Sequence, residues 1–141
     1  MPRVIAIDYG QKRTGLAVTD TDQIIAGPLE TIPTQQLIDF LTRYLAKETV
    51  ECFVVGKPYN MDFSDSQSSK MIEDFVVHLG RKFPLIKIVR IDERFTSKMA
   101  SQTILESGKN KKARQDKALV DKVSAVILLQ DYLLRKEFNR N

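Results

Sequence analysis

Near its start the chain reads Val4-Ile5-Ala6-Ile7-Asp8-Tyr9-Gly10-Gln11-Lys12-Arg13-Thr14-Gly15-Leu16-Ala17-Val18-Thr19. Two short apolar runs, 4–7 and 15–19, flank a polar connection with a glycine near each end. This pattern predicts a strand, a tight connection and a second strand. Residues 24–32 predict a third strand, in which Pro28 indicates a sheet edge or a bulge.

Beyond residue 33 the apolar residues recur at helical spacing, and helices then alternate with strands. The spacing predicts helices over 34–47, with Thr34 as N-cap, after Ser66, over 97–106 and over 118–136. Apolar runs predict strands over 53–56 and 86–91. Alternating strands and helices imply right-handed crossovers and parallel pairing, while the first two strands form a hairpin. We therefore expect an α/β fold with a five-stranded mixed sheet flanked by helices, in the order βββαβαβαα or βββαβαβα.

Length and composition indicate one domain spanning residues 1–141, because 141 residues with 43% apolar content can bury a self-sufficient core. The single cysteine, Cys52, lies in an apolar run and is interpreted as a buried strand residue, which excludes a disulfide scaffold. No apolar stretch approaches the roughly 20 residues of a membrane span, and the start lacks a signal-peptide core. We expect a cytoplasmic protein without a membrane partner.

Positive charge is concentrated in one segment. The chain has 22 Lys and Arg against 18 Asp and Glu, a net charge of +4, and six of the basic residues lie between 109 and 122. A predicted basic loop over about 108–117 contains Lys109, Lys111, Lys112 and Arg114. Clustered cations favour nucleic acid as partner, because binding releases counterions from the phosphates. The alternative is a loop that only aids solubility.

Acidic residues lie at the ends of predicted elements. Asp8 follows the first strand, Asp92 and Glu93 follow the fifth, and Asp121 lies near the start of the last helix, sharing a face with Ser124. Sites in α/β sheets form beyond the carboxyl ends of parallel strands, so Asp8 and Glu93 would emerge together if their strands are neighbours.

Carboxylates held close together repel one another unless a cation neutralises them. Oxygen ligands favour Mg²⁺ or Mn²⁺, and two such ions about 4 Å apart can activate water and stabilise the leaving oxygen in phosphodiester cleavage. The alternative is that these acids cap turns or helices, and that Asp121 favours the N-terminus of its helix.

Four ordered motifs between residues 4 and 134 resemble one family. The segment Asp8 to Ala17 resembles the opening signature of the YqgF (RuvX) family of Holliday junction resolvases, which have an RNase H-like fold. Residues 55–58 with 60–62 resemble its glycine-proline loop, which includes Gly56 and Pro58, residues 92–97 its second acidic motif, and residues 121–133 its last helix.

The resemblance implies a metal-dependent nuclease, a hydrolase of phosphodiester bonds, with Asp8, Glu93 and Asp121 as catalytic metal ligands. For this family the role is described both as junction resolution and as maturation of the 5′ end of pre-16S ribosomal RNA, and both stay open. The chain departs from the family at Lys57, where an apolar residue is usual, and at Phe63, where glycine is common. Some related resolvases have a fourth acid where this chain has Ser124.

Further roles are expected around these acids. We expect Lys12 and Arg13 to contact phosphate, and Arg94 to orient Glu93 or clamp a phosphate. Gly10 and Gly15 would shape the hairpin, Thr96 would cap the following helix, and Asp92 would be structural. A four-way junction has two-fold symmetry, which would favour a homodimer.

Two other classes of protein share features with this sequence. An actin-like nucleotide-binding protein would explain Asp8-Tyr9-Gly10, but such proteins close two domains over the nucleotide, and this chain supplies one. The chain also lacks the Gly-Lys-Ser/Thr ending of a Walker A loop. A non-catalytic nucleic-acid-binding module stays open and differs from the nuclease in showing no Mg²⁺-dependent cleavage.

Overall fold

The computed structural model describes residues 2–58, 66–93 and 117–138. The elements are, in chain order, β1 (Arg3–Asp8), β2 (Arg13–Thr19), β3 (Ala26–Pro33), the 3-10 helix η1 (Thr34–Gln36), α1 (Leu37–Lys47), β4 (Val50–Pro58), α2 (Ser66–Lys82), β5 (Lys87–Glu93) and α5 (Lys117–Phe138). The helix predicted over 97–106 and most of the basic loop lie outside the described residues.

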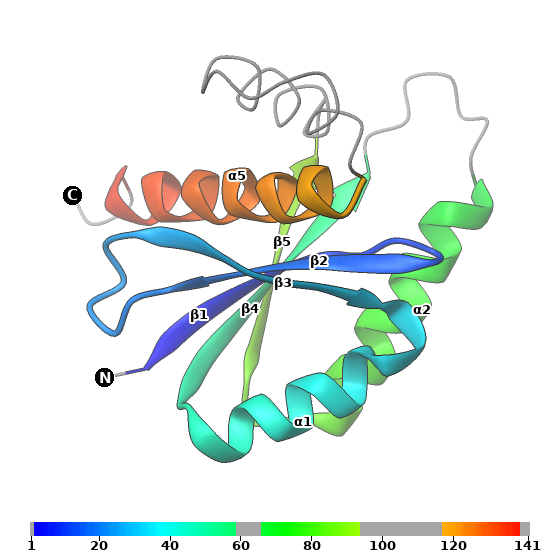
Figure 1. Ribbon diagram of the computed structural model, residues 1–141, viewed down its shortest axis with the longest axis horizontal. Helices are drawn as coiled ribbons and strands as arrows, with labels where there is room; N and C mark the ends of the chain where they lie inside the picture. Colours follow the sequence, from blue (N-terminus) through cyan, green and yellow to red (C-terminus); the bar gives the residue numbers. More distant parts are fainter. Residues whose placement is uncertain (1, 59–65, 94–116, 139–141) are drawn as a thin grey trace.

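The five strands form one mixed sheet in the order β3-β2-β1-β4-β5. β2 is antiparallel to β1 and β3, whereas β1, β4 and β5 pair in parallel. Helix α5 covers one face of the sheet, and α1 and α2 cover the other (Figure 1). The predicted five-stranded mixed sheet with flanking helices is therefore confirmed.

The central strand β1 is apolar on both faces because helices cover both. Val4 and Ala6 pack in the core beneath α5, while Ile5 and Ile7 pack in the core against α1 and α2. All four side chains are fully buried. Cys52 of β4 is a buried free cysteine, as the sequence predicted.

One condition of the sequence analysis is not met, and two local expectations change. β1 and β5 are not neighbours, because β4 lies between them. Asp8 and Glu93 are the last residues of their strands and do not follow them. Thr34 does not cap α1, whose N-cap is Gln36 without a side-chain hydrogen bond.

Pro28 satisfies both readings of the sequence. It lies on β3, an edge strand of the sheet. The β2–β3 register also shifts between Leu16 and Ala17, whose partners are Glu30 and Pro28.

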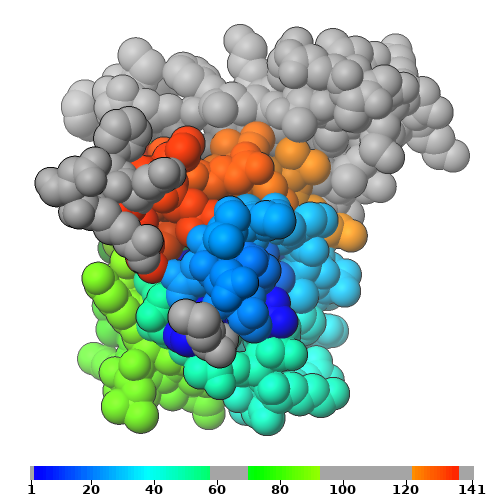
Figure 2. Space-filling model, turned by 90° about the vertical axis from the view of Figure 1, so that its left-hand side faces the viewer, coloured from blue at the N-terminus to red at the C-terminus, as the bar shows by residue number. Residues whose placement is uncertain are grey.

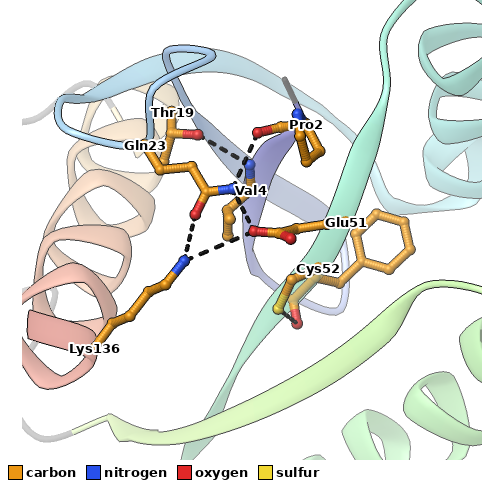
Figure 3. A network of polar contacts seen from close by, with 8 residues as sticks. Pro2, Val4, Thr19, Gln23, Glu51, Cys52 and Lys136 are labelled. Atoms are coloured by element: carbon orange, nitrogen blue, oxygen red, sulfur yellow. Dashed lines mark hydrogen bonds and ion pairs between the residues drawn. The ribbon is translucent and has the colours of Figure 1, made fainter. Parts of the chain in front are cut away.

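At one end of the molecule a polar network ties α5 to the sheet (Figure 3). Gln23, which adopts a positive φ of 57°, donates from Nε2 to the Pro2 carbonyl and to Glu51. Lys136 of α5 donates to Gln23 Oε1 at 2.5 Å and lies 3.7 Å from Glu51 Oε1. Figure 2 faces this end and shows the β2–β3 connection, in blue, directly beneath the red end of α5. The network fixes the C-terminal end of α5, whose other end carries Asp121.

None of the described helices is long and apolar enough to cross a bilayer.

Candidate active site

The parallel strands β1, β4 and β5 have their carboxyl ends at the same end of the sheet, which we call the catalytic edge. Asp8, on the central strand β1, lies in the middle of this catalytic edge. Ile7 pairs with Val55 and Gly56 with Ile91, so Asp8 at the end of β1 is level with Gly56 and Ile91, and β4 and β5 continue two residues further to Pro58 and Glu93. The chain leaves β1 toward β2 on one side, and leaves β4 toward β5 on the other. The gap between β1 and β4 is thus the point where the strand order reverses, which is where α/β sheets form their sites.

Strand alternation places position 93 on the same face of the sheet as Asp8. Val4 and Ala6 belong to the core beneath α5, so Asp8 follows them on that face. Ile91 belongs to the same core, so two residues later position 93 also falls on that face. Because β4 intervenes, the backbones of β1 and β5 are about 10 Å apart, or two strand spacings.

Glycines border Asp8 on both neighbouring strands. Gly15 is its direct partner on β2, and Gly56 follows Val55, the β4 partner of Ile7. Neither strand therefore presents a side chain next to the Asp8 carboxylate on the α5 face. The half-buried Asp8 is thus flanked by glycine positions on both neighbouring strands.

The connection after Asp8 is held by a residue that the sequence analysis placed elsewhere. Thr34 donates from Oγ1 to the Gly10 carbonyl at 2.6 Å and from its backbone N–H to the Lys12 carbonyl at 3.1 Å. A Cβ on Gly10 would lie 2.3 Å from the Arg13 carbonyl oxygen, so only glycine fits there without rearrangement. The role expected for Gly10 in shaping the hairpin agrees with this close approach.

Helix α5 presents small residues to the sheet near this edge. Ser124 and Ala125 are fully buried, and Ala125 packs in the same core as Ala6. Position 121 lies three and four residues earlier, on the same face of the helix. The Ser124 hydroxyl oxygen is buried without a hydrogen-bond partner among the described residues. Buried hydroxyls nearly always have a partner, so this oxygen lies where an ordered water or ion ligand would satisfy it.

The remaining predicted site residues lie on the Asp8 face of the sheet, on its opposite face, in the connection after Asp8, or outside the described residues. Arg13 begins β2 and shares the face of Gly15 and Asp8 by alternation, whereas Lys12 is exposed in the connection. Asp92 is exposed and falls on the face opposite Asp8, across from Lys57. Outside the described residues lie Arg94, Thr96, Lys109, Lys111, Lys112 and Arg114.

Arg90 was not anticipated and supports the strand next to the site. Its guanidinium donates to the Val55 carbonyl at 3.3 Å, to the Gly56 carbonyl at 3.4 Å and to Glu73 Oε2 at 2.9 Å. The hydrogen bond from Arg90 holds the pKa of Glu73 below its ordinary value. Arg90 thus ties the end of β4 to α2. No local signal in the sequence identified its partners.

The donors around this edge are oxygens, which suit a hard divalent cation. Among the side chains that the structure describes, which do not include those of Glu93 and Asp121, no group of three His, Cys, Asp or Glu is placed to hold a metal. The fit to a cation therefore rests on the Asp8 carboxylate between two glycine positions and on the unpartnered Ser124 oxygen.

Similarity to known proteins shows the family of the chain. A family model described as RuvX, Holliday junction resolvase, matches residues 2–135. The chain belongs to the RuvX family. The prediction of a nuclease that hydrolyses phosphodiester bonds of nucleic acid is confirmed at the level of this family.

Relatives within the RuvX family align with nearly the whole chain. A protein of Flavobacterium johnsoniae, named "Putative pre-16S rRNA nuclease", is 58% identical over 138 residues, which cover 98% of this chain and 100% of that protein. A protein of Porphyromonas gingivalis with the same name is 57% identical over 133 residues, covering 94% of this chain and 96% of its own length.

Solved structures confirm the RNase H-like fold of this RuvX chain. T. thermophilus RuvC in complex with a Holliday junction substrate superimposes with a TM-score of 0.58 at 16% identity, covering 97% of both chains. Fowlpox virus resolvase, solved with substrate Holliday junction DNA, gives a TM-score of 0.57 at 15% identity and covers 94% of this chain and 97% of its own. At this identity the likeness shows the fold alone.

Proposed function

We propose that this protein is a divalent-metal-dependent nuclease that matures pre-16S ribosomal RNA, with Asp8, Glu93 and Asp121 as metal ligands. The observation that carries the proposal is the position of Asp8 at the strand-order reversal, bordered by Gly15 and Gly56 beneath α5. Position 93 shares this face of the sheet, and position 121 lies on the helix face that packs against it.

The protein's own groups have distinct tasks in this proposal. Asp8 supplies a carboxylate fixed by strand pairing, and the flanking glycines let a phosphate approach the backbone closely. Bound Mg²⁺ or Mn²⁺, as a pair of ions, would supply the Lewis-acid chemistry of phosphodiester hydrolysis. Arg13 lies on the Asp8 face and would hold a substrate phosphate by charge-assisted hydrogen bonds, with Lys12 beside it. Ser124, where some related resolvases have an acid, would hold a water of the metal site.

Binding of the nucleic-acid backbone would extend beyond this edge. Arg94 and the basic loop residues Lys109, Lys111, Lys112 and Arg114 are proposed as phosphate contacts, since they account for the local excess of positive charge. The proposal treats residues 1–141 as one nuclease domain and places it in the cytoplasm, where ribosomal RNA is processed.

The names of the relatives favour precursor ribosomal RNA as the substrate. Proteins 57% and 58% identical over nearly their full lengths are both named for pre-16S rRNA. Holliday junction resolution is the second candidate, favoured by the family description and by the RuvC-like fold. That activity would favour a homodimer, because the junction presents two equivalent strands related by two-fold symmetry.

Both substrates should be tested side by side with wild type and Asp8→Asn. We expect wild type to cleave a pre-16S rRNA fragment in Mg²⁺ or Mn²⁺, and the isosteric Asp8→Asn to bind that fragment but not cleave it. Preferential cleavage of a four-way DNA junction would instead establish the second candidate. Cleavage by Asp8→Asn at the wild-type rate would remove Asp8 from the mechanism. Binding by wild type without any metal-dependent cleavage would leave the non-catalytic binding module as the correct reading.

A further inference from the structure

A second candidate site lies behind the catalytic edge, on the face of the sheet away from α5. An open cavity of about 410 Å³ lies between the start of α1 and the middle of α2. Its walls include an aromatic pair, two apolar side chains and two polar ones: Tyr9, Phe75, Ile38, Met71, Asp74 and His78. The volume falls within the range of cavities that take small organic ligands.

The cavity adjoins the proposed catalytic carboxylate through the backbone. Tyr9 follows Asp8 directly, and successive residues of a strand direct their side chains to opposite faces of the sheet. Ile5 and Ile7 alternate with Asp8 and belong to the core against α1 and α2, and Tyr9 packs on that core. Asp8 and Tyr9 are therefore neighbours in the chain that face opposite sides of the sheet where β1 ends, so a substrate that contacts both would pass around this end of the sheet.

An aromatic stack forms one wall. The rings of Tyr9 and Phe75 have centroids 4.5 Å apart and planes inclined by 24°. Phe75 is buried and fixes the position of Tyr9, whereas Tyr9 is half-buried and reaches the cavity. Flat aromatic side chains held in this way are the surfaces on which proteins stack unpaired bases.

The charged side chain in the cavity lining disfavours a phosphate. Asp74 is exposed at the cavity and carries a carboxylate, with His78 one turn later on the same side of α2. A carboxylate repels phosphate and accepts hydrogen bonds from N–H groups, such as the amino groups of nucleobases. Thr34 also lines the cavity, but its hydroxyl already donates to Gly10.

We propose that this cavity is a subsite for one unstacked nucleobase of the substrate, adjacent to the phosphate at Asp8. The base lies against Tyr9, between Ile38 and Met71, and its amino group donates to Asp74. The subsite rests on the proposed nuclease function and deepens it. It selects a substrate with an unpaired, amino-bearing nucleotide, adenine, guanine or cytosine, next to the cleaved bond.

The test is a binding experiment that does not depend on cleavage. A pre-16S rRNA fragment and a four-way DNA junction are each prepared as a series with one abasic nucleotide at successive positions. Binding is measured by fluorescence anisotropy in EDTA for wild type, Tyr9→Leu and Asp74→Asn. Asp39→Asn, which removes an exposed carboxylate of α1 outside the cavity, is the matched control for charge.

We expect one abasic position to weaken binding by wild type about tenfold, the effect of one stacked base. Tyr9→Leu and Asp74→Asn should weaken binding of the intact strand to a similar degree and lose the extra effect of that abasic position. Asp39→Asn should bind as tightly as wild type or tighter. Asp74 is exposed, so its variant tests the subsite even if Tyr9→Leu unfolds.

Two other results would distinguish failure of the subsite from failure of the proposed function. If wild type binds both nucleic acids and every abasic position affects wild type and Asp74→Asn equally, the subsite is refuted while the nuclease proposal stands. If wild type binds neither nucleic acid, the proposed function itself fails.

Discussion

Gly15 pairs directly with Asp8 across the β1–β2 ladder, and Gly56 stands at the same level on the other neighbouring strand. The acid at the centre of the sheet edge is thus bordered by backbone on both sides. Asp8 thus lies on the α5 face between two glycine positions, whereas Asp92 lies on the opposite face of the sheet.

The inequality of the two faces predicts different effects at adjacent acids. Glu93→Gln should abolish metal-dependent cleavage, because position 93 falls on the face of Asp8. Asp92→Asn should retain cleavage within a few-fold, because Asp92 is exposed and falls on the opposite face. Single-turnover cleavage of the precursor RNA fragment checks both. Loss of cleavage in Asp92→Asn with full activity in Glu93→Gln would reverse the assignment.

The buried Ser124 hydroxyl predicts that one substitution changes both metal binding and the free energy of unfolding. The unpartnered buried hydroxyl costs free energy in the metal-free protein, so Ser124→Ala should raise the free energy of unfolding by about 1 kcal/mol in EDTA. The same change should weaken Mn²⁺ binding, since it removes the oxygen that would hold a metal-bound water. Urea unfolding with and without Mn²⁺ measures both effects. A loss of stability in EDTA would show that the hydroxyl has a partner in solution.

The close approach of the Gly10 and Arg13 backbones predicts that a side chain at position 10 destabilises the fold. Gly10→Ala should lower the free energy of unfolding by about 1–3 kcal/mol, because its Cβ would lie 2.3 Å from the Arg13 carbonyl oxygen. Gly27→Ala is the matched control, since no atom lies within 4 Å of its added Cβ. Equal stability of the two variants would contradict the observed hairpin geometry.

The Glu73–Arg90 pair predicts a pH dependence of stability. Arg90 lowers the pKa of Glu73 in the folded protein, so the pair stabilises the fold above the ordinary glutamate pKa. That stabilisation is lost as pH falls through the lower folded value. Because the Glu73 side chain is 50% exposed, Glu73→Gln should cost less than about 1 kcal/mol at neutral pH. The difference from wild type should vanish in acid, as urea unfolding at several pH values would measure; a constant difference would exclude the ion pair as its cause.

The basic segment predicts the salt dependence of nucleic-acid binding. Replacing Lys111, Lys112 and Arg114 by Ala should weaken binding and flatten its dependence on salt concentration by up to about three phosphate contacts. Titrations at several salt concentrations give the slope. An unchanged slope would show that these residues do not contact the backbone and only aid solubility.

The amino-acid sequence by itself determined the element types and the chemistry. The apolar runs of residues 4–7 and 53–56 have to be buried on both faces, and helical spacing after Ser66 and Ala118 supplies the helices that bury them. Four ordered motifs were enough to indicate the family, because they lie in the local segments that carry its chemistry.

Only the tertiary structure decided which residues meet. Local periodicity contains no information on strand order, so it could not show that β4 separates Asp8 from Glu93. The same limit applies to Thr34, whose hydroxyl bonds Gly10 24 residues away, and to Arg90, whose partners lie on β4 and α2. Such contacts form between segments that are distant in the sequence. Burial and hydrogen-bond geometry decide which of them form as the chain folds.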